Sequence, residues 1–261
     1  MKMNKSKKIV KPTINIVFVI VSFLLFSSFC RSKEVYINSK NTYKTKTNYT
    51  NTCKEYTISR VRETVRQDSS FEKILDVDRF NSVDIRLPAI VSIKQGKSQR
   101  VVVVAKQNVI DKLNTKVSNG VLIIKFNNGI DNYRYINLEI TVPTIENIKI
   151  LSAAKVFMSS FKGPKNLKIT LKGAGIFKAV EDMTLKGSLL IKNSGVGLIN
   201  CYKISTKKCK VIVSGVGKCD VRSESELEVE INGVGIVNYK GHPKKIRKEI
   251  NGLGTLKNQN D

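Results

Sequence analysis

A Gly-x-Gly phrase that returns five times in the last third of the chain constrains the fold more than any other feature. The copies are Gly173-Ala174-Gly175, Gly195-Val196-Gly197, Gly215-Val216-Gly217, Gly233-Val234-Gly235 and Gly252-Leu253-Gly254. Their first glycines are 22, 20, 18 and 19 residues apart, and no 3.6-residue apolar period lies between them. Such a period is typical of a solenoid whose coils consist of β-strands and turns. We therefore predict that these ten glycines, called the corner glycines below, mark the same corner of each stacked coil.

The residues around the corner glycines predict which side chains fill the solenoid. Counted from the first glycine of each copy, positions −4, −2, +1 and +4 are mostly apolar, whereas positions −1 and +5 are polar. Coils stacked in register would align the four apolar positions into interior ladders, so that each coil buries its face against its neighbours. The glycines are expected to adopt positive φ at the corner and to let one coil pack close to the next.

Residues 1–30 have the composition of an export signal. Lysines precede the apolar run Ile14–Phe26, which is shorter than a membrane span and fits the apolar region of a signal peptide. Cys30 follows Leu25-Phe26-Ser27-Ser28-Phe29, an order that resembles a lipobox except for the bulky Phe29. Three outcomes are open: lipidation at Cys30, cleavage after Cys30 with secretion, and an uncleaved signal anchor. All three place the rest of the chain outside the cytoplasm.

The remainder divides by composition. Residues 31–70 are rich in Lys, Thr, Asn, Tyr and Ser without a periodic apolar face, which predicts a disordered, basic tether. Residues 71–147 form a β-rich first half, residues 148–257 hold the repeats, and residues 258–261 form a polar tail. In the first half, alternation and Val/Ile runs predict strands, Ser118-Asn119-Gly120 a hairpin turn, and residues 111–113 a helical turn. The strands are expected at 80–88, 89–93, 100–105, 115–117, 121–126 and 135–142. The predicted fold class is all-β.

The charge balance is strongly basic. The net charge is +25, from 46 Lys and Arg against 21 Asp and Glu, and removing the five lysines before residue 31 leaves +20. An excess of this size attracts polyanions such as acidic glycans, anionic lipids or nucleic acid. A solvated, lysine-rich surface is the alternative explanation.

Cysteine and histidine usage argues against a metal or a catalytic centre. The five cysteines, an odd number without paired metal-ligand spacing, predict neither a disulfide framework nor a zinc site. Cys201 and Cys219 fall at apolar positions and are interpreted as core residues, whereas Cys53 lies in the tether. The single histidine, His242, stands in a Gly-His-Pro turn. We expect no metal, no cofactor and no catalytic residue.

The glycines and acids suggest three chemistries, and the sequence favours none of them. No copy reads Gly-x-Gly-x-x-Gly or leads into a helix, so a nucleotide site is not predicted. Residues 215–220 are similar to a calcium β-roll, but that motif needs a nine-residue repeat with aspartate in successive copies. A polysaccharide lyase would need converging acids or a basic residue with partners. The alternating acids are interpreted as a solvated strand face; they are Glu224, Glu226, Glu228 and Glu230.

The repeats resemble a known family. Gly195-Val196-Gly197-Leu198-Ile199-Asn200, Gly233-Val234-Gly235-Ile236-Val237-Asn238, the opening run 80–85 and the run 117–124 are similar in order to motifs of the putative auto-transporter adhesin head GIN domain family. The resemblance covers about residues 71–257. It implies a right-handed parallel β-helix with coils of about 20 residues, in a bacterial envelope protein that is often a lipoprotein, and no catalytic residues.

Together these features predict an exported, envelope-associated solenoid that acts as a non-catalytic, adhesin-like binding or structural module. It is expected in the outer membrane or facing the periplasm of a Gram-negative bacterium, or secreted. The expected partner is an envelope protein or glycan, with no specific nucleic acid and with the membrane contacted through a lipid or signal anchor. The alternatives are a module that binds acidic glycan or anionic lipid and, behind it, a lyase. An exposed last strand near Leu256 would favour an oligomer.

Overall fold

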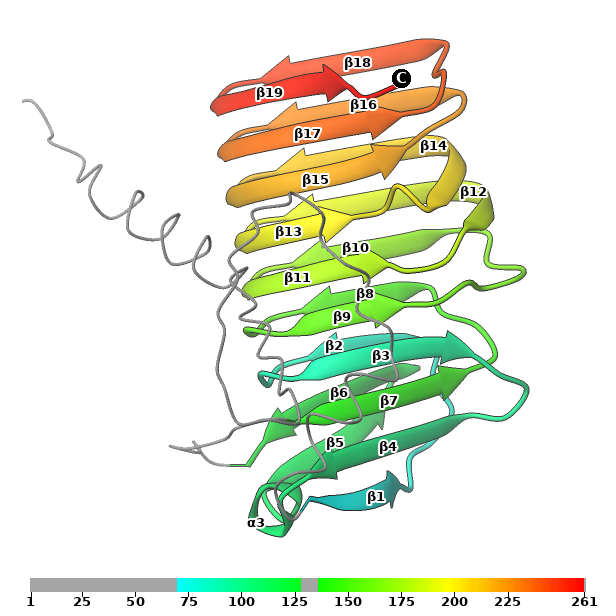
Figure 1. The fold of residues 1–261 in the computed structure, drawn as a ribbon, viewed down its shortest axis with the longest axis vertical. Helices are drawn as coiled ribbons and strands as arrows, with labels where there is room; N and C mark the ends of the chain where they lie inside the picture. Colours follow the sequence, from blue (N-terminus) through cyan, green and yellow to red (C-terminus); the bar gives the residue numbers. More distant parts are fainter. Residues whose placement is uncertain (1–69, 128–135, 261) are drawn as a thin grey trace, which may run out of the picture. The chain divides into compact units, whose positions relative to one another are not determined.

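The computed structural model describes residues 70–127 and 136–260, of which 63% lie in strands and 2% in helix. The predicted signal segment, the tether up to residue 69, Cys30 and Cys53 lie outside the described residues. The strands form two sheets that enclose one core between them (Figure 1). We call the ten-stranded sheet A and the nine-stranded sheet B.

In spatial order, sheet A consists of β1 (Phe71–Leu75), β4 (Arg100–Ala105), β7 (Asn137–Val142), β3 (Ile90–Gln95), β9 (Lys155–Met158), β11 (Ala174–Ala179), β13 (Val196–Asn200), β15 (Val216–Arg222), β17 (Val234–Lys240) and β19 (Leu253–Asn258). Sheet B consists of β18 (Lys245–Ile250), β16 (Glu226–Ile231), β14 (Ile204–Val213), β12 (Met183–Asn193), β10 (Leu167–Leu171), β8 (Asn147–Ile150), β2 (Ser82–Ile85), β6 (Val121–Phe126) and β5 (Leu113–Ser118). The short helix α3 (Gln107–Ile110) precedes β5. No helix among the described residues is long and apolar enough to cross a membrane.

From β8 onward the chain is a solenoid of about five turns with coils of about 21 residues. Each coil runs through one strand of sheet B, a two-residue corner, one strand of sheet A and a short turn back to sheet B. Successive coils pair in parallel and in register, as in the ladder Ile169–Ile191–Val211–Val229. The predicted all-β solenoid is therefore confirmed.

The corner glycines serve close packing. In each copy the first glycine ends the corner, and the second is the second residue of a sheet A strand. A Cβ on Gly195 would lie 2.1 Å from the carbonyl oxygen of Gly173, and one on Gly197 would lie 1.9 Å from that of Gly175. Among these ten glycines only Gly217 has a positive φ, of 155°. The prediction of positive φ is thus wrong for the other nine glycines. At these positions a side chain is excluded because its Cβ would overlap atoms of the preceding coil.

Three of the four apolar positions fill the core, and the fourth does not. Position −4 is buried until the last coil, where Lys248 occupies it, and positions −2 and +4 are likewise interior. Position +1, predicted to be interior, instead lies on the outer face of sheet A: Val234 is 38% exposed and Leu253 is 77% exposed. The reason is the two-residue corner, because strand alternation then directs +1 outward and the second glycine inward.

The first half continues both sheets but not in chain order. β2 and β3 form a coil that pairs in parallel with β8 and β9 on one side and with β6 and β7 on the other. The coil of β6 and β7 follows β2 and β3 in sequence but lies on the side of them away from the solenoid. After β7 the chain therefore passes the coil of β2 and β3 before it begins β8. Antiparallel strands β5, β4 and β1 finish this end of the stack (Figure 1).

Local signals in this half were mostly well placed. The strands predicted at 100–105 and 121–126 coincide with β4 and β6. The predicted hairpin turn joins β5 to β6, with φ of 50° at Asn119 and 71° at Gly120, the left-handed pair that an Asn-Gly turn requires. The helical turn predicted at 111–113 was wrong. The helix is α3, four residues earlier, and β5 already begins at Leu113.

Candidate functional site

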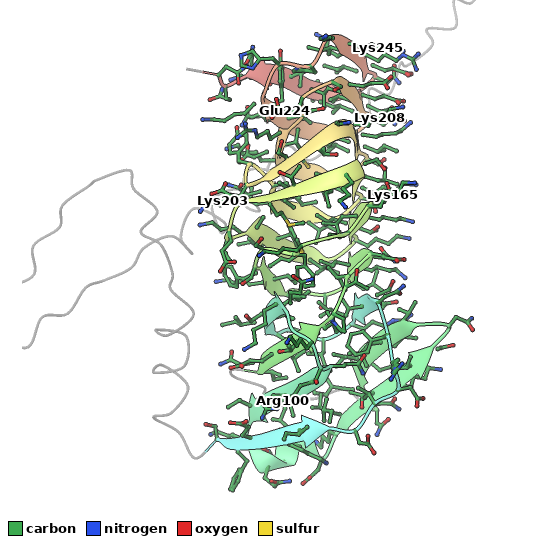
Figure 2. All side chains as sticks on the ribbon, turned by 90° about the vertical axis from the view of Figure 1, so that its right-hand side faces the viewer. Arg100, Lys165, Lys203, Lys208, Glu224 and Lys245 are labelled. Atoms are coloured by element: carbon green, nitrogen blue, oxygen red, sulfur yellow. The ribbon has the colours of Figure 1, made fainter. Side chains whose placement is uncertain are left out.

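The outer face of sheet B carries a group of lysines over β8 to β14. Parallel pairing places Lys149, Thr170, Lys192 and Ile212 in one row, and Lys168, Leu190 and Lys210 in the next. Lys172 follows at the corner end of β10. We call Lys149, Lys168, Lys172, Lys192 and Lys210 the lysine face. The four strands that bear it contain no Asp or Glu. Figure 2 shows that Lys208 and Lys245 project from this same side of the stack.

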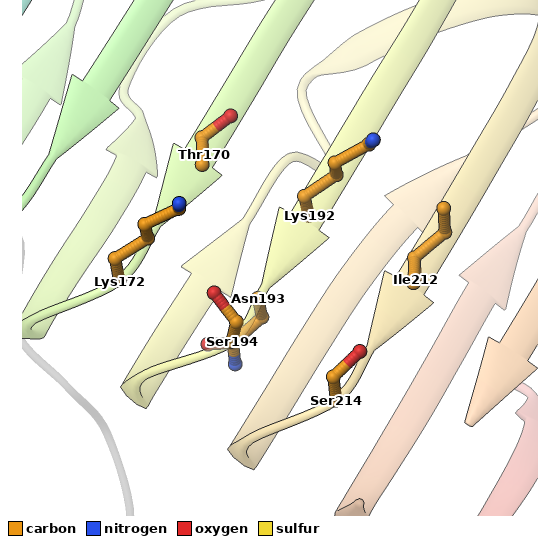
Figure 3. A pocket seen from close by; sticks show the side chains of 7 residues that line it. All are labelled: Thr170, Lys172, Lys192, Asn193, Ser194, Ile212 and Ser214. Carbon is orange, nitrogen blue, oxygen red and sulfur yellow. The ribbon is translucent and has the colours of Figure 1, made fainter. Parts of the chain in front are cut away.

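A shallow hollow of about 180 Å³ lies within the lysine face beside the corner. It is lined by Thr170, Lys172, Lys192, Asn193, Ser194, Ile212 and Ser214. In Figure 3, Lys192 lies between Thr170 and Ile212, and Ser194 lies between Lys172 and Ser214, so two short rows cross three coils. The hollow therefore presents ammonium and hydroxyl groups to solvent along the stacking direction, an arrangement suited to an extended anionic ligand.

Acids hold the lysines at the two borders of the face. On the side of β2, Asp84 accepts hydrogen bonds from Lys149 (3.2 Å) and Arg86 (2.8 Å), and its side chain is 5% exposed. On the side of β16, Glu228 lies 2.6 Å from Lys210, and this hydrogen bond raises the lysine's pKa. Lys168, Lys172 and Lys192, between these borders, make no ion pair with any described residue. Their charge is thus available to a ligand.

The four glutamates predicted as a solvated strand face are half-buried and bonded. Glu226 lies 3.8 Å from Lys208 and 3.3 Å from Lys245, and its pKa is lowered chiefly by the hydrogen bond from Lys245. Glu230 accepts from Asn232, while Glu224 lies in the turn before β16 and binds Arg222 at 2.7 Å. These acids spread along cross-strand ion pairs and do not converge on one point.

The outer face of sheet A is apolar next to the same corner. Position +1 contributes Val196, Val216, Val234 and Leu253, and position +3 contributes Ile176, Leu198 and Ile236. We call these seven residues the apolar strip. Leu198 is 38% exposed and Ile236 is 39% exposed. Lys218 interrupts the second row between them. No aromatic residue belongs to the strip.

One buried carboxylate accompanies this face. Asp220 is 6% exposed, accepts a 2.8 Å hydrogen bond from Asn238 and lies 3.2 Å from Lys218. Tyr202 lies beside it: burial, with the charge of Asp220 as the second cause, raises the pKa of Tyr202 to about 12. Because both oxygens of Asp220 have partners, the cluster fixes the turn after β13 and offers no free acid or base.

The three cysteines of the solenoid are free thiols in the core. Cys201, Cys209 and Cys219 are each at most 2% exposed. Burial raises the pKa of Cys219 to about 12 and raises those of the other two as well. They are therefore protonated and poor nucleophiles at neutral pH. Within the described residues no group of His, Cys, Asp and Glu side chains is arranged to hold a metal ion.

The glycines, His242 and Cys30 singled out from the sequence contribute no described side chain to either surface. The corner glycines form the corner between lysine face and apolar strip, His242 is exposed in the turn before β18, and Cys30 is outside the described residues. The polar position −1, recognised in the sequence, contributes Lys172, Ser194 and Ser214 to the hollow, whereas the lysines within the strands and the apolar strip were missed. The lysines repeat at a 21-to-22-residue offset from Lys149 to Lys192, with Thr170 between them, a signal that becomes visible once strand register is known.

Comparison with known proteins bears on the family and the fold. The family model described as "Putative auto-transporter adhesin, head GIN domain" matches residues 79–243. The crystal structure of a putative adhesin from Bacteroides fragilis NCTC 9343 has a TM-score of 0.56 at 19% identity, covering 74% of this chain and 98% of that chain. A putative adhesin from Parabacteroides merdae ATCC 43184 has a TM-score of 0.45 at 16% identity, covering 74% and 97%. No curated protein matches the chain.

Proposed function

The chain belongs to the putative auto-transporter adhesin, head GIN domain family, and from this premise we propose that it is an exported, non-catalytic binding module of the cell envelope. The stack of coils acts as a rigid scaffold whose outward rows present side chains at the strand spacing of about 4.8 Å. What remains to be assigned is the surface that binds and the chemistry that it takes.

We propose that the lysine face binds an acidic polysaccharide. The observation that carries this proposal is the absence of acids from β8, β10, β12 and β14, which leaves Lys168, Lys172 and Lys192 without ion pairs to described residues. A charged polymer laid along the stack would meet one ammonium group after another, with hydroxyls of Thr170, Ser194 and Ser214 as further hydrogen-bond donors. The +20 charge of the chain beyond the N-terminal lysines adds long-range attraction.

Retention on immobilised acidic polysaccharide tests this assignment. The Lys168→Gln/Lys172→Gln/Lys192→Gln variant should bind on the order of tenfold more weakly, since exposed ion pairs contribute on the order of 0.2–1 kcal/mol each. The matched control removes three lysines from the first half and from other surfaces, Lys73→Gln/Lys97→Gln/Lys112→Gln, at the same net charge. Equal loss in both variants would mean that only total charge matters and would refute a defined face.

Two further measurements test the rest of the proposal. Incubating the chain with acidic polysaccharides should yield no ultraviolet-absorbing unsaturated products. Their appearance would make it a lyase. Mass spectrometry of the mature N-terminus separates the three export outcomes: a lipid-modified Cys30, a chain that starts at Arg31, and an uncleaved chain. An unprocessed chain recovered from the cytoplasm would contradict export.

A further inference from the structure

The apolar strip is a surface that the proposed glycan binding does not use. Seven large apolar side chains of the described residues are exposed, and four of them belong to the strip: Leu198, Val234, Ile236 and Leu253. These four lie on β13, β17 and β19, and the whole strip spans the five neighbouring strands β11 to β19, a length of about 19 Å at the strand spacing. Contiguous exposed apolar side chains of this kind mark a surface that meets a partner.

The charges beside the strip are positive. The ladder that contains Ile176 and Leu198 includes Lys155 of β9, and the next ladder on the same face contains Lys178 and ends at Lys257. The six sheet A strands from β9 to β19 contain a single acidic residue, Asp220, and it is buried against Lys218 and Asn238. This face therefore combines aliphatic side chains with lysines and exposes almost no negative charge.

That combination selects one occupant. A second copy of the chain placed face to face would bring lysine against lysine and add the repulsion of two strongly basic bodies. A sugar polymer would find no aromatic ring within the strip, because the half-buried Phe157 of this face lies beyond it, in β9 beside Lys178. An anionic lipid surface satisfies both features, because aliphatic side chains enter the boundary between headgroups and acyl chains while lysines bind the phosphates.

We propose that the outer face of sheet A docks on an anionic lipid surface through the apolar strip, with Lys155, Lys178 and Lys257 contacting headgroups. Sheet B lies on the opposite side of the core, so the lysine face is directed away from the lipid. This inference stands on sheet A alone and does not depend on glycan binding by sheet B.

A tryptophan reporter gives a local test, because the chain contains no tryptophan. The full-length Leu198→Trp variant is mixed with vesicles that contain phosphatidylglycerol and brominated lipid. The matched control is Ile212→Trp on the lysine face. We expect blue-shifted and quenched emission from position 198, none from position 212, and no change with phosphatidylcholine vesicles. The local readout separates the strip from any binding by the apolar N-terminal segment, which both variants share.

The lysines and the alternative occupants are tested in the same assay. Lys155→Gln, Lys178→Gln and Lys257→Gln should each weaken vesicle binding by on the order of fivefold at low salt. Quenching at position 212 but not 198, or at neither position, would overturn the proposal. A blue shift at position 198 without vesicles, together with dimers in light scattering, would overturn the proposal in favour of a second copy of the chain. A blue shift at position 198 produced by acidic polysaccharide would overturn it in favour of a sugar polymer. If Leu198→Trp misfolds by circular dichroism, Ile236→Trp replaces it.

Discussion

Replacing Gly197 with alanine tests whether coil spacing is what the corner glycines determine. The new Cβ would lie 1.9 Å from the carbonyl oxygen of Gly175, whereas real Cβ contacts essentially never fall below 3.0 Å. A separation of more than 1 Å is therefore needed. The backbone has little freedom to provide it, because β13 pairs with β11 on one side and β15 on the other, and the Val196 N–H donates to Gly173 at 3.0 Å.

The magnitude follows from three terms. Overpacking in a tight interior costs about 1–3 kcal/mol. Lengthening two ladder hydrogen bonds adds about 0.5–1.5 kcal/mol each. The smaller conformational freedom of alanine in the unfolded chain offsets about 0.4–1 kcal/mol. The net loss is on the order of 3 kcal/mol, which lowers Tm by about 6–12 °C for a body of this size.

Thermal unfolding followed by circular dichroism measures the effect. Ser194→Ala is the matched control, because Ser194 lies in the same corner with an exposed side chain, and such a change should stay within about 0.5 kcal/mol. A Tm for Gly197→Ala within about 2 °C of the native value would refute the reasoning, since it would mean that neighbouring coils can separate at negligible cost. An equal fall for Ser194→Ala would refute it as well.

Three further changes probe the interior and the open end. The buried amide of Asn193 faces the weakly accepting Cys219 thiol and has no other hydrogen-bond partner in the described part of the chain. Asn193→Leu should therefore raise the urea-unfolding free energy by about 1–3 kcal/mol, and a decrease would show that the amide is needed. Burial raises the pKa of Tyr202 to about 12 from 10.0, so the unfolded chain loses that proton first and stability falls between these pH values. Between these pH values Tm should therefore fall more steeply in the native chain than in the Tyr202→Phe variant. Equal slopes of Tm against pH would contradict a raised pKa of Tyr202 as the cause. Lys248 pairs with Val229 at an interior position of the last coil, where an inward charge opposes end-to-end stacking. The Lys248→Val variant should associate as its concentration rises, measured by light scattering, whereas the outward Arg247→Val variant should stay monomeric. If both variants stay monomeric, Lys248 does not prevent end-to-end association.

The order of residue types along the repeats is sufficient by itself to predict the solenoid. Each coil repeats the same local pattern, with an apolar residue four positions before the glycine and another four after it, and register follows because one face must be buried. The Asn119-Gly120 turn was equally readable, since two positive φ angles favour that dipeptide. These are local constraints, set by neighbours within a few residues.

Tertiary structure alone decided the order of coils in the first half and the faces of the stack. In sheet B, β2 lies between β6 and β8, although chain order would place β6 between β2 and β8. These strands have similar compositions, so their sequences do not indicate which edge of β2 pairs with β6. The direction of position +1 depended on the length of the corner, because one residue more or less reverses the alternation that follows. The lysine face and the apolar strip arise from residues about 20 positions apart, and only the stacking of coils brings them side by side.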